Sequence, residues 1–339
     1  MAIAAHDGPP PALAVGEAVE DWTGDARFHE YSAAADPVGS GAISPVPVQE
    51  FPAAVHGGPG TRLIPLDLSG PLGTGYPATS PALLASFLVL APGDSLTTEP
   101  DATSELYYCI EGNGHLEFTR TPIPGDAPGP GMTGGRIEWG SGDFVVLPAG
   151  CTCHHRAAPG ERALLYRVTD APLVDYLGVV PGRARFAPTR YPAAASLARL
   201  AEVAAHPGAA SRSRVSILLG NTAHPQTRTV THTLWAMLGV LPAGRVQRPH
   251  RHQSVALDLI TDCAPGCYTL VGSELDQGGQ IVDPVRVDWE SAGAFVTPPG
   301  LWHSHHNESD CPAHLVPIQD AGLHTYLRSL DIRFTPSAG

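Results

Sequence analysis

The sequence predicts an all-β protein in which two similar domains of antiparallel strands are joined by a helix. Glycine (37) and proline (35) are abundant among the 339 residues and aromatic residues make up only 6%, which is typical of many short strands connected by turns. Short apolar runs alternate with turn residues over 61–180, for example in 82–94, 105–118 and 143–150. One pattern of glycines and polar side chains occurs twice, which indicates an internal repeat.

The second copy of this pattern carries the histidines. From Gly244 the chain reads G-x5-H-x-H, so His250 and His252 are two residues apart and share one face of a strand. The segment 298–307 reads P-x-G-x2-H-x3-N and supplies His303 from another strand. Three neutral imidazoles that converge on one point suit a first-row transition metal and leave positions open for substrate and oxygen.

The first copy, over 93–112 and 142–153, has lost these histidines. At and beside its ligand positions stand Glu99, Asp101, Glu105, Cys153 and His154. Such a mixture lacks the paired C-x2-C spacing of a structural zinc site. We therefore expect a degenerate, packed domain here, and a second metal held by some of these side chains is the alternative.

The two histidine segments resemble the metal-site motifs of the cupin superfamily. LWAMLGVLPAGRVQRPHRHQSVAL (234–257) and TPPGLWHSHHN (297–307) resemble the gentisate 1,2-dioxygenase family, which includes salicylate and 1-hydroxy-2-naphthoate dioxygenases. The resemblance is dense over 212–320 and weaker over 60–180. It implies a bicupin, two antiparallel β-barrels (double-stranded β-helices) in one chain, with one Fe(II) that cleaves aromatic rings with O2. The iron ligands that it implies are His250, His252 and His303.

The expected domain boundaries follow from composition and periodicity. Helical spacing of Leu197, Leu200 and Val203 predicts a helix over 193–205. Residues 121–135 are expected to form an exposed loop, and 321–334 a short helix and strand that pack back on a barrel. The chain is thus expected to comprise a partly irregular N-terminal arm (1–60), a degenerate barrel (61–190), the linker helix (191–212) and the metal-binding barrel with a C-terminal extension (213–339).

The resemblance also implies roles around the metal. Trp235 stands where the family keeps a tryptophan in the substrate pocket, and Arg214 falls near an arginine that pairs with the substrate carboxylate. His305, on the strand face of His303, matches a histidine able to exchange protons with substrate or oxygen. The alternatives are core packing for Trp235, a solvated charge for Arg214 and an edge position for His305.

Two positions depart from the family pattern. Where the family has an arginine that points into the pocket, this chain has Asp258, which strand alternation places on the face of His250. Where the family often has a glutamine, this chain has Gly239. A negative pocket wall disfavours a dianionic aromatic acid and favours an amine or a neutral polar group, which puts gentisate itself in question. Alternatively, Asp258 pairs with Arg214 or another arginine.

The sequence thus indicates a mononuclear non-haem Fe(II) dioxygenase that acts with O2 on a small chelating substrate, aromatic and substituted with hydroxyl or amino groups. Two other classes stay open. One is a redox-neutral cupin isomerase, decarboxylase or hydrolase that uses Zn, Mn or Ni. The other is a non-catalytic cupin that binds a metabolite. Family members are usually homo-oligomers, and we expect the same here.

Charge and composition argue against several other functions. The net charge of −13 disfavours nucleic acid and acidic membrane surfaces as partners, and no apolar run is long enough to span a bilayer. All 20 basic residues are arginine, which excludes Schiff-base and P-loop lysine chemistry. The sequence starts with no signal-peptide pattern, and its six cysteines suggest no disulfide framework, so we expect a cytoplasmic protein with reduced thiols.

Overall fold

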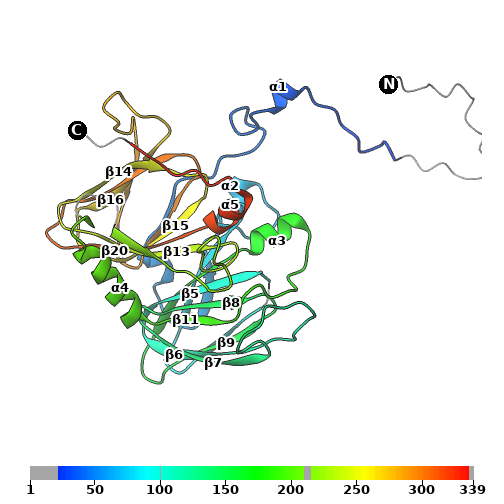
Figure 1. Cartoon of the computed structure of the whole chain (residues 1–339), viewed down its shortest axis with the longest axis vertical. Coiled ribbons are helices and arrows are strands. Elements are labelled where there is room, and N and C mark those ends of the chain that lie inside the picture. Colours follow the sequence, from blue (N-terminus) through cyan, green and yellow to red (C-terminus); the bar gives the residue numbers. More distant parts are fainter. Residues whose placement is uncertain (1–21, 100, 210–214, 336–339) are drawn as a thin grey trace, which may run out of the picture. The chain divides into compact units, whose positions relative to one another are not determined.

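The computed structural model describes residues 22–99, 101–209 and 215–335. The chain divides into two units, Met1–Ile43 and Ser44–Gly339. In the first unit, the described residues are exposed and contain one short helix, α1 (Tyr31–Ala34). The Glu30 carboxylate caps this helix by accepting hydrogen bonds from the backbone N–H groups of Ser32 and Ala33. The remaining elements all belong to the second unit (Figure 1).

Antiparallel sheets arranged in two pairs build the second unit, and each pair combines a six-stranded sheet with a smaller one. In the first sheet pair, the larger sheet contains, in spatial order, β11 (Thr189–Tyr191), β8 (Phe144–Pro148), β5 (Ser104–Glu111), β10 (Ala163–Thr169), β3 (Leu84–Leu90) and β2 (Arg62–Pro65). Its smaller sheet contains β4 (Ser95–Thr98), β9 (Thr152–Ala157), β6 (Asn113–Thr119) and β7 (Gly134–Gly140).

The second sheet pair repeats this plan. Its larger sheet contains β1 (Gln49–Phe51), β18 (Ala294–Thr297), β15 (Ala256–Asp262), β20 (Ala313–Gln319), β13 (Trp235–Leu241) and β12 (Val215–Leu218). Its smaller sheet contains β17 (Val285–Asp288), β16 (Cys267–Gly272), β19 (Trp302–Asn307), β14 (Val246–Arg251) and β21 (Arg333–Phe334). This architecture confirms the predicted all-β class and the repeat of one supersecondary unit.

The two six-stranded sheets pack against each other through a shared apolar core. Phe87 and Tyr166 of the first sheet pair and Leu257 and Ile318 of the second belong to this one buried cluster. Separate cores fill the interior of each pair. The four sheets therefore follow one another as layers, which Figure 1 shows with β14 and β16 at one end and β6, β7 and β9 at the other.

Helices occupy the connections between strands. The remaining ones are η1 (Ala53–His56), α2 (Ser69–Leu72), α3 (Ala171–Leu177), α4 (Ala193–Ala205) and α5 (Ala321–Leu327). The helix predicted over 193–205 is α4, which packs on β12 and buries Leu200, whereas Leu197 is exposed. The predicted C-terminal helix and strand are α5 and β21, and β21 pairs with β14. Among the described residues, no helix has the length and apolar character needed to cross a membrane.

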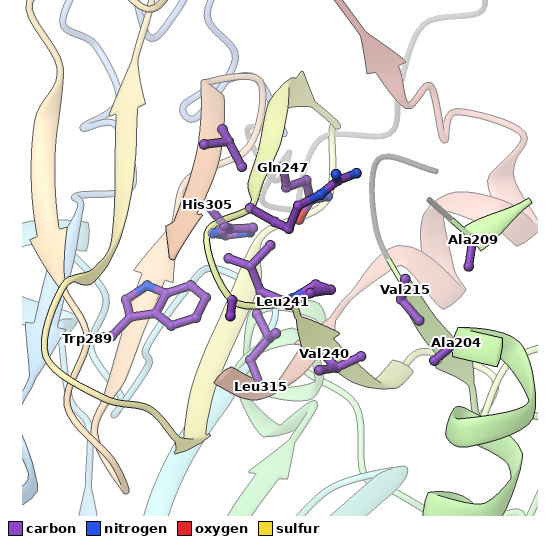
Figure 2. Close-up of a pocket in the computed structure, with 13 residues that line it drawn as sticks. Ala204, Ala209, Val215, Val240, Leu241, Gln247, Trp289, His305 and Leu315 are labelled. Atoms are coloured by element: carbon purple, nitrogen blue, oxygen red, sulfur yellow. The ribbon is translucent and has the colours of Figure 1, made fainter. Parts of the chain in front are cut away.

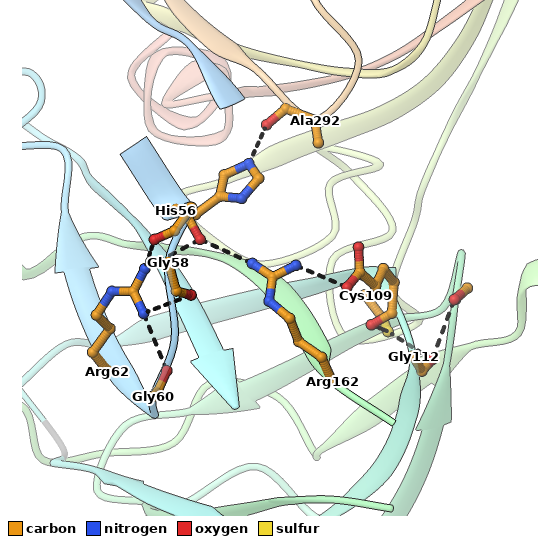
Figure 3. Close-up of polar contacts among 11 residues, drawn as sticks. His56, Gly58, Gly60, Arg62, Cys109, Gly112, Arg162 and Ala292 are labelled. Carbon is orange, nitrogen blue, oxygen red and sulfur yellow. Dashed lines mark hydrogen bonds and ion pairs between the residues drawn. The ribbon is translucent and has the colours of Figure 1, made fainter. Parts of the chain in front are cut away.

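The segment before the first sheet pair ties the two pairs together. β1 pairs with β18 of the second pair, whereas β2 pairs with β3 of the first. Between them, His56 Nε2 lies 3.1 Å from the carbonyl oxygen of Ala292, and Arg162 donates a 2.9 Å hydrogen bond to the carbonyl of His56 (Figure 3). The segment 1–60, expected to be an N-terminal arm, therefore supplies strand β1 to the second sheet pair.

A buried ion pair lies inside the first sheet pair. Arg167 Nη2 lies 2.9 Å from Glu105 Oε2 and 3.1 Å from Asp101 Oδ1. Tyr107 donates a 2.6 Å hydrogen bond to the same Glu105 oxygen. Burial raises the pKa of Glu105, and the Arg167 charge opposes that rise. The Glu105 carboxylate, which stands at a ligand position of the first motif copy, is thus paired with the guanidinium of Arg167.

The helices α3 and α5 begin at equivalent buried aspartates. Asp170 accepts hydrogen bonds from the backbone N–H groups of Thr103 and Ser104, and Asp320 accepts one of 2.9 Å from Val255 N–H. Each carboxylate therefore fixes its helix to the start of a central strand. Burial raises the pKa of Asp320 to about 7, although the hydrogen bond from Val255 lowers it.

We predict that Asp320 makes stability depend on pH. Its pKa is near 4 when unfolded and about 7 when folded, so the folded state binds an extra proton between these values. The stabilising contribution is full below about pH 4 and is lost as the pH rises through about 7. Relative to Asp320→Asn, the wild-type free energy of unfolding should fall on the order of 2–4 kcal/mol across this window. Urea unfolding measures it, with exposed Asp175→Asn as control, and a constant difference would contradict it.

We also predict that Arg167→Met destabilises the protein by about 3–5 kcal/mol, because the buried Glu105 carboxylate loses its counter-charge. Adding Glu105→Gln should recover most of this loss, since the double variant leaves no buried unpaired charge at the pair. Chemical denaturation of both single variants and the double variant measures the coupling. Additive losses would show that the pair does not act as a unit.

Candidate metal centre

Four buried histidines gather on the neighbouring strands β14 and β19. His250 is paired directly with His303, and Gln247 with His305, with a bulge between the two pairings. His252 follows the last residue of β14. The ring centroid of His303 lies 4.0 Å from that of His250, 4.8 Å from that of His252 and 5.8 Å from that of His305.

Distance alone allows more than one set of three ligands. One ring nitrogen from each of His250, His303 and His305 lies within 4.8 Å of the others. In the described part of the chain, this is the only group of three or more potential ligands that meets this criterion. The set expected from the sequence contains His252 in place of His305, and the ring centroids of His250 and His252 lie 6.2 Å apart.

Hydrogen bonds at Nδ1 fix the tautomer of three of these four rings. Nδ1 lies 3.1 Å from the Arg248 carbonyl in His250, 2.8 Å from the Ser254 carbonyl in His252 and 3.1 Å from the Leu301 carbonyl in His303. A carbonyl oxygen only accepts hydrogen bonds, so each of these Nδ1 atoms carries the proton. Each neutral ring therefore presents the Nε2 lone pair, as metal-binding histidines generally do.

Hydrogen bonds among neighbouring side chains hold His252 in place. The Ser254 hydroxyl lies 3.0 Å from His252 Nδ1 and donates a 3.0 Å hydrogen bond to Gln319 Oε1. Gln319 ends β20, next to Asp320, which accepts from the backbone of Val255. These hydrogen bonds attach the turn after β14 to the larger sheet, and they thereby fix the orientation of the His252 imidazole.

The structure places three of the four expected substrate residues. Asp258 is buried between the sheets of its pair and accepts a 2.9 Å hydrogen bond from the Thr297 hydroxyl. Trp235 starts β13 opposite Gln319, and its indole nitrogen is buried. A Cβ on Gly239 would lie 2.7 Å from Ser216 Oγ and 3.4 Å from Leu315 Cδ2. Arg214 lies outside the described residues.

A cavity of about 330 Å³ adjoins the histidine cluster. Its polar wall includes His305 and Gln247, and its apolar wall includes Leu241, Leu315 and Trp289, as Figure 2 shows. Sequence reasoning missed this cavity, since Trp235, Gly239 and Asp258 are not among its lining residues. Only His305 was singled out beforehand, because the other lining residues sit in apolar strand patterns that resemble any core.

The polar residues of the first copy do not converge in the same way. Glu99 and His154 are exposed, whereas Glu105 and Cys153 are buried. Glu105 and Asp101 are both bound to Arg167. Burial raises the pKa of the Cys153 thiol well above its usual value, which disfavours the thiolate that a metal requires. Glu105 and Cys153 thus lie in a packed interior, and the degenerate character of this domain stays a prediction.

Comparison with known proteins agrees with the motifs. The chain is 29% identical over 96 residues to gentisate 1,2-dioxygenase 1 of Aquipseudomonas alcaligenes and 30% identical over 93 residues to a 1-hydroxy-2-naphthoate 1,2-dioxygenase of Nocardioides sp. (strain KP7). These matches cover 28% and 27% of this chain, but only 24% and 21% of those relatives. No protein-family model matches the chain.

Solved structures show the same fold over most of the chain. Salicylate 1,2-dioxygenase from Pseudaminobacter salicylatoxidans superposes with a TM-score of 0.61 at 15% identity, covering 85% of this chain and 88% of that one. An oxalate decarboxylase superposes with a TM-score of 0.52 at 14% identity, covering 79% and 76%. The chain therefore has the bicupin fold, and the comparisons confirm its predicted resemblance to the gentisate 1,2-dioxygenase family.

Proposed function

We propose that the protein is a mononuclear non-haem Fe(II) dioxygenase that acts on a small chelating aromatic compound. The observation that carries this proposal is the set of three buried imidazoles, His250, His252 and His303, whose Nδ1 atoms each face a backbone carbonyl. This arrangement supports three neutral nitrogen ligands at one site. Such a set suits a ferrous ion and leaves coordination positions for other ligands.

Bound Fe(II) would supply the chemistry that brings together a chelating substrate and O2. The chain supplies the surroundings. A site with only neutral protein ligands keeps the full double charge of the metal, which favours an anionic bidentate substrate. Burial of the histidines, all at most 4% exposed, excludes bulk water from their immediate neighbourhood.

The cavity supports a small, ring-sized substrate. Its volume of about 330 Å³ lies at the small end of ligand sites, and its wall combines apolar side chains with three polar ones, Arg245, Gln247 and His305. The relatives act on hydroxylated aromatic acids according to their names, and salicylate 1,2-dioxygenase has been crystallised with gentisate. These similarities support a substrate of the same class.

The position of Asp258 favours a substrate whose polar substituent is not a second carboxylate. Its carboxylate is buried on the inner side of β15, with Thr297 as a hydrogen-bond donor. A negative charge at this position on the inner side of β15 would disfavour a second substrate carboxylate and favour an amino or neutral polar group. We infer an amino- or hydroxy-substituted ring rather than gentisate. His305 would exchange protons with the bound substrate, and Arg214 would hold a polar end. Trp235 and Gly239 do not line the cavity, so they would shape it through neighbouring side chains such as Leu315, which lies next to Gly239.

The ligand assignment predicts a specific pattern of metal loss. Protein purified without oxygen should contain about one iron per chain by elemental mass spectrometry. His250→Ala, His252→Ala and His303→Ala should each lose it, because two imidazoles bind ferrous iron weakly. His305→Ala should retain it. His306→Ala is the control, because that ring stacks on Tyr268 outside the cluster. Iron retained in His252→Ala but lost in His305→Ala would identify the other triad.

The proposed reaction predicts oxygen uptake that depends on substrate. Iron-loaded protein should consume O2 with amino-phenolic or phenolic compounds in an electrode assay, and less with gentisate. Asp258→Asn should shift the kcat/KM preference towards carboxylate-bearing rings on the order of tenfold, since a buried charge is removed. Asp262→Asn, at the exposed end of the same strand, should not. Turnover in the absence of O2, or with Zn, Mn or Ni, would instead identify a redox-neutral enzyme.

The remaining expectations concern assembly and location. Homo-oligomer formation and a cytoplasmic location stay predictions from the sequence. Size-exclusion chromatography with light scattering of the full chain determines the first.

A further inference from the structure

A chain of buried hydrogen bonds leads to His305 from outside the histidine cluster. The indole N–H of Trp289 donates a 2.8 Å hydrogen bond to the Thr269 hydroxyl oxygen. The same oxygen lies 2.8 Å from His305 Nδ1. Thr269 is fully buried, His305 is 1% exposed and Trp289 is 7% exposed. Trp289 directly follows β17, Thr269 lies in β16 and His305 lies in β19, so three separate segments build this chain of hydrogen bonds.

Donor and acceptor capacities fix the direction of this chain. An indole nitrogen can only donate, so the Thr269 oxygen accepts from Trp289. The hydroxyl keeps one proton to donate, and in the described residues the only other partner in hydrogen-bonding range is His305 Nδ1. If Nδ1 donated instead, the hydroxyl proton would be buried without an acceptor, which costs about 1–3 kcal/mol. The satisfied arrangement makes His305 Nδ1 an acceptor.

We propose that Thr269 and Trp289 are positioning residues that hold neutral His305 in the tautomer with its proton on Nε2. This assignment rests on the proposed function for its catalytic meaning. It separates His305 from the ligand histidines, which are held in the opposite tautomer by carbonyl oxygens. A ring with a proton on Nε2 donates a hydrogen bond from that atom and cannot offer it to a metal.

The tautomer gives His305 a definite task at the wall of the cavity. His305 and Trp289 both line that cavity (Figure 2). From the wall of the cavity, Nε2–H of His305 would donate a hydrogen bond to a negatively charged oxygen of the substrate and could supply a proton to it. For Nδ1 to take up a proton after Nε2 has lost one, the Thr269 hydroxyl must first rotate away from it. Thr269 therefore disfavours the tautomer with the proton on Nδ1.

The proton position can be measured directly in the full chain. In protein labelled with 15N-histidine and loaded with diamagnetic Zn(II), two-bond 1H–15N spectra separate rings protonated on Nδ1 from rings protonated on Nε2. His305 is assigned by the signal that disappears in His305→Asn. We expect Nε2–H for His305 and Nδ1–H for the three ligands. Nδ1–H at His305 in the wild type would overturn the proposal.

Variants test whether Thr269 and Trp289 set this tautomer. Thr269→Val removes the donor to Nδ1 and should give a mixed His305 signal, and Trp289→Phe should do so in part. Thr269→Ser should restore Nε2–H. Thr97→Val is the matched control, because Thr97 makes a 2.8 Å contact with Nδ1 of the exposed His154. Unchanged Nε2–H at His305 in Thr269→Val would overturn the assignment of Thr269.

Kinetics then connect the tautomer with catalysis. Thr269→Val should lower kcat about tenfold with KM and metal content nearly unchanged, and Thr269→Ser should recover most of it. An equal kcat for the valine variant and the wild type would overturn the positioning role. Nε2–H at His305 without oxygen uptake by the wild type would support the tautomer assignment and contradict the dioxygenase proposal, so the two failures are distinguishable.

Discussion

The apolar layer between the two six-stranded sheets is the contact on which the rest of the structure depends. Leu257 and Leu259 of β15 face this layer, so strand alternation turns Asp258 towards the interior of the second sheet pair. The same periodicity leaves the inner faces of β14 and β19 free to carry histidines rather than core residues. The smaller sheet can carry the polar centre because the larger sheet supplies the apolar layer that joins the two pairs.

Local patterns made much of this fold predictable. The glycine-bounded motifs predicted the histidine cluster, and helical spacing predicted α4. Non-local contacts were not predictable. The pairing of β1 with β18 joins segments from opposite ends of the chain, and β1 carries no signal for its partner. The cavity was missed for a related reason, since Leu241 and Leu315 follow ordinary strand alternation and line it only after the sheets close.

The histidines of the centre show that residue type and distance do not define a role. His252 and His305 both lie near His303, and the partners of Nδ1 distinguish them. His252 Nδ1 faces a carbonyl and a hydroxyl that donates to Gln319, whereas His305 Nδ1 faces the Thr269 hydroxyl. The register of β14, β16 and β19 determines which group lies beside each Nδ1 atom, and this neighbour sets the tautomer of each ring. A shift of one residue in either pairing would exchange inner and outer faces.

The crossing of β1 has a consequence for how the protein is made. Strand β1 (Gln49–Phe51) is translated long before its partner β18 (Ala294–Thr297). The edge of the histidine-bearing sheet pair therefore closes only after all the residues between β1 and β18 are present, and this closure joins residues far apart in sequence. The two halves carry a repeated architecture, but they are not interchangeable parts. If the second half were expressed by itself, the β18 edge would lack its partner strand and the large apolar face would be exposed to solvent.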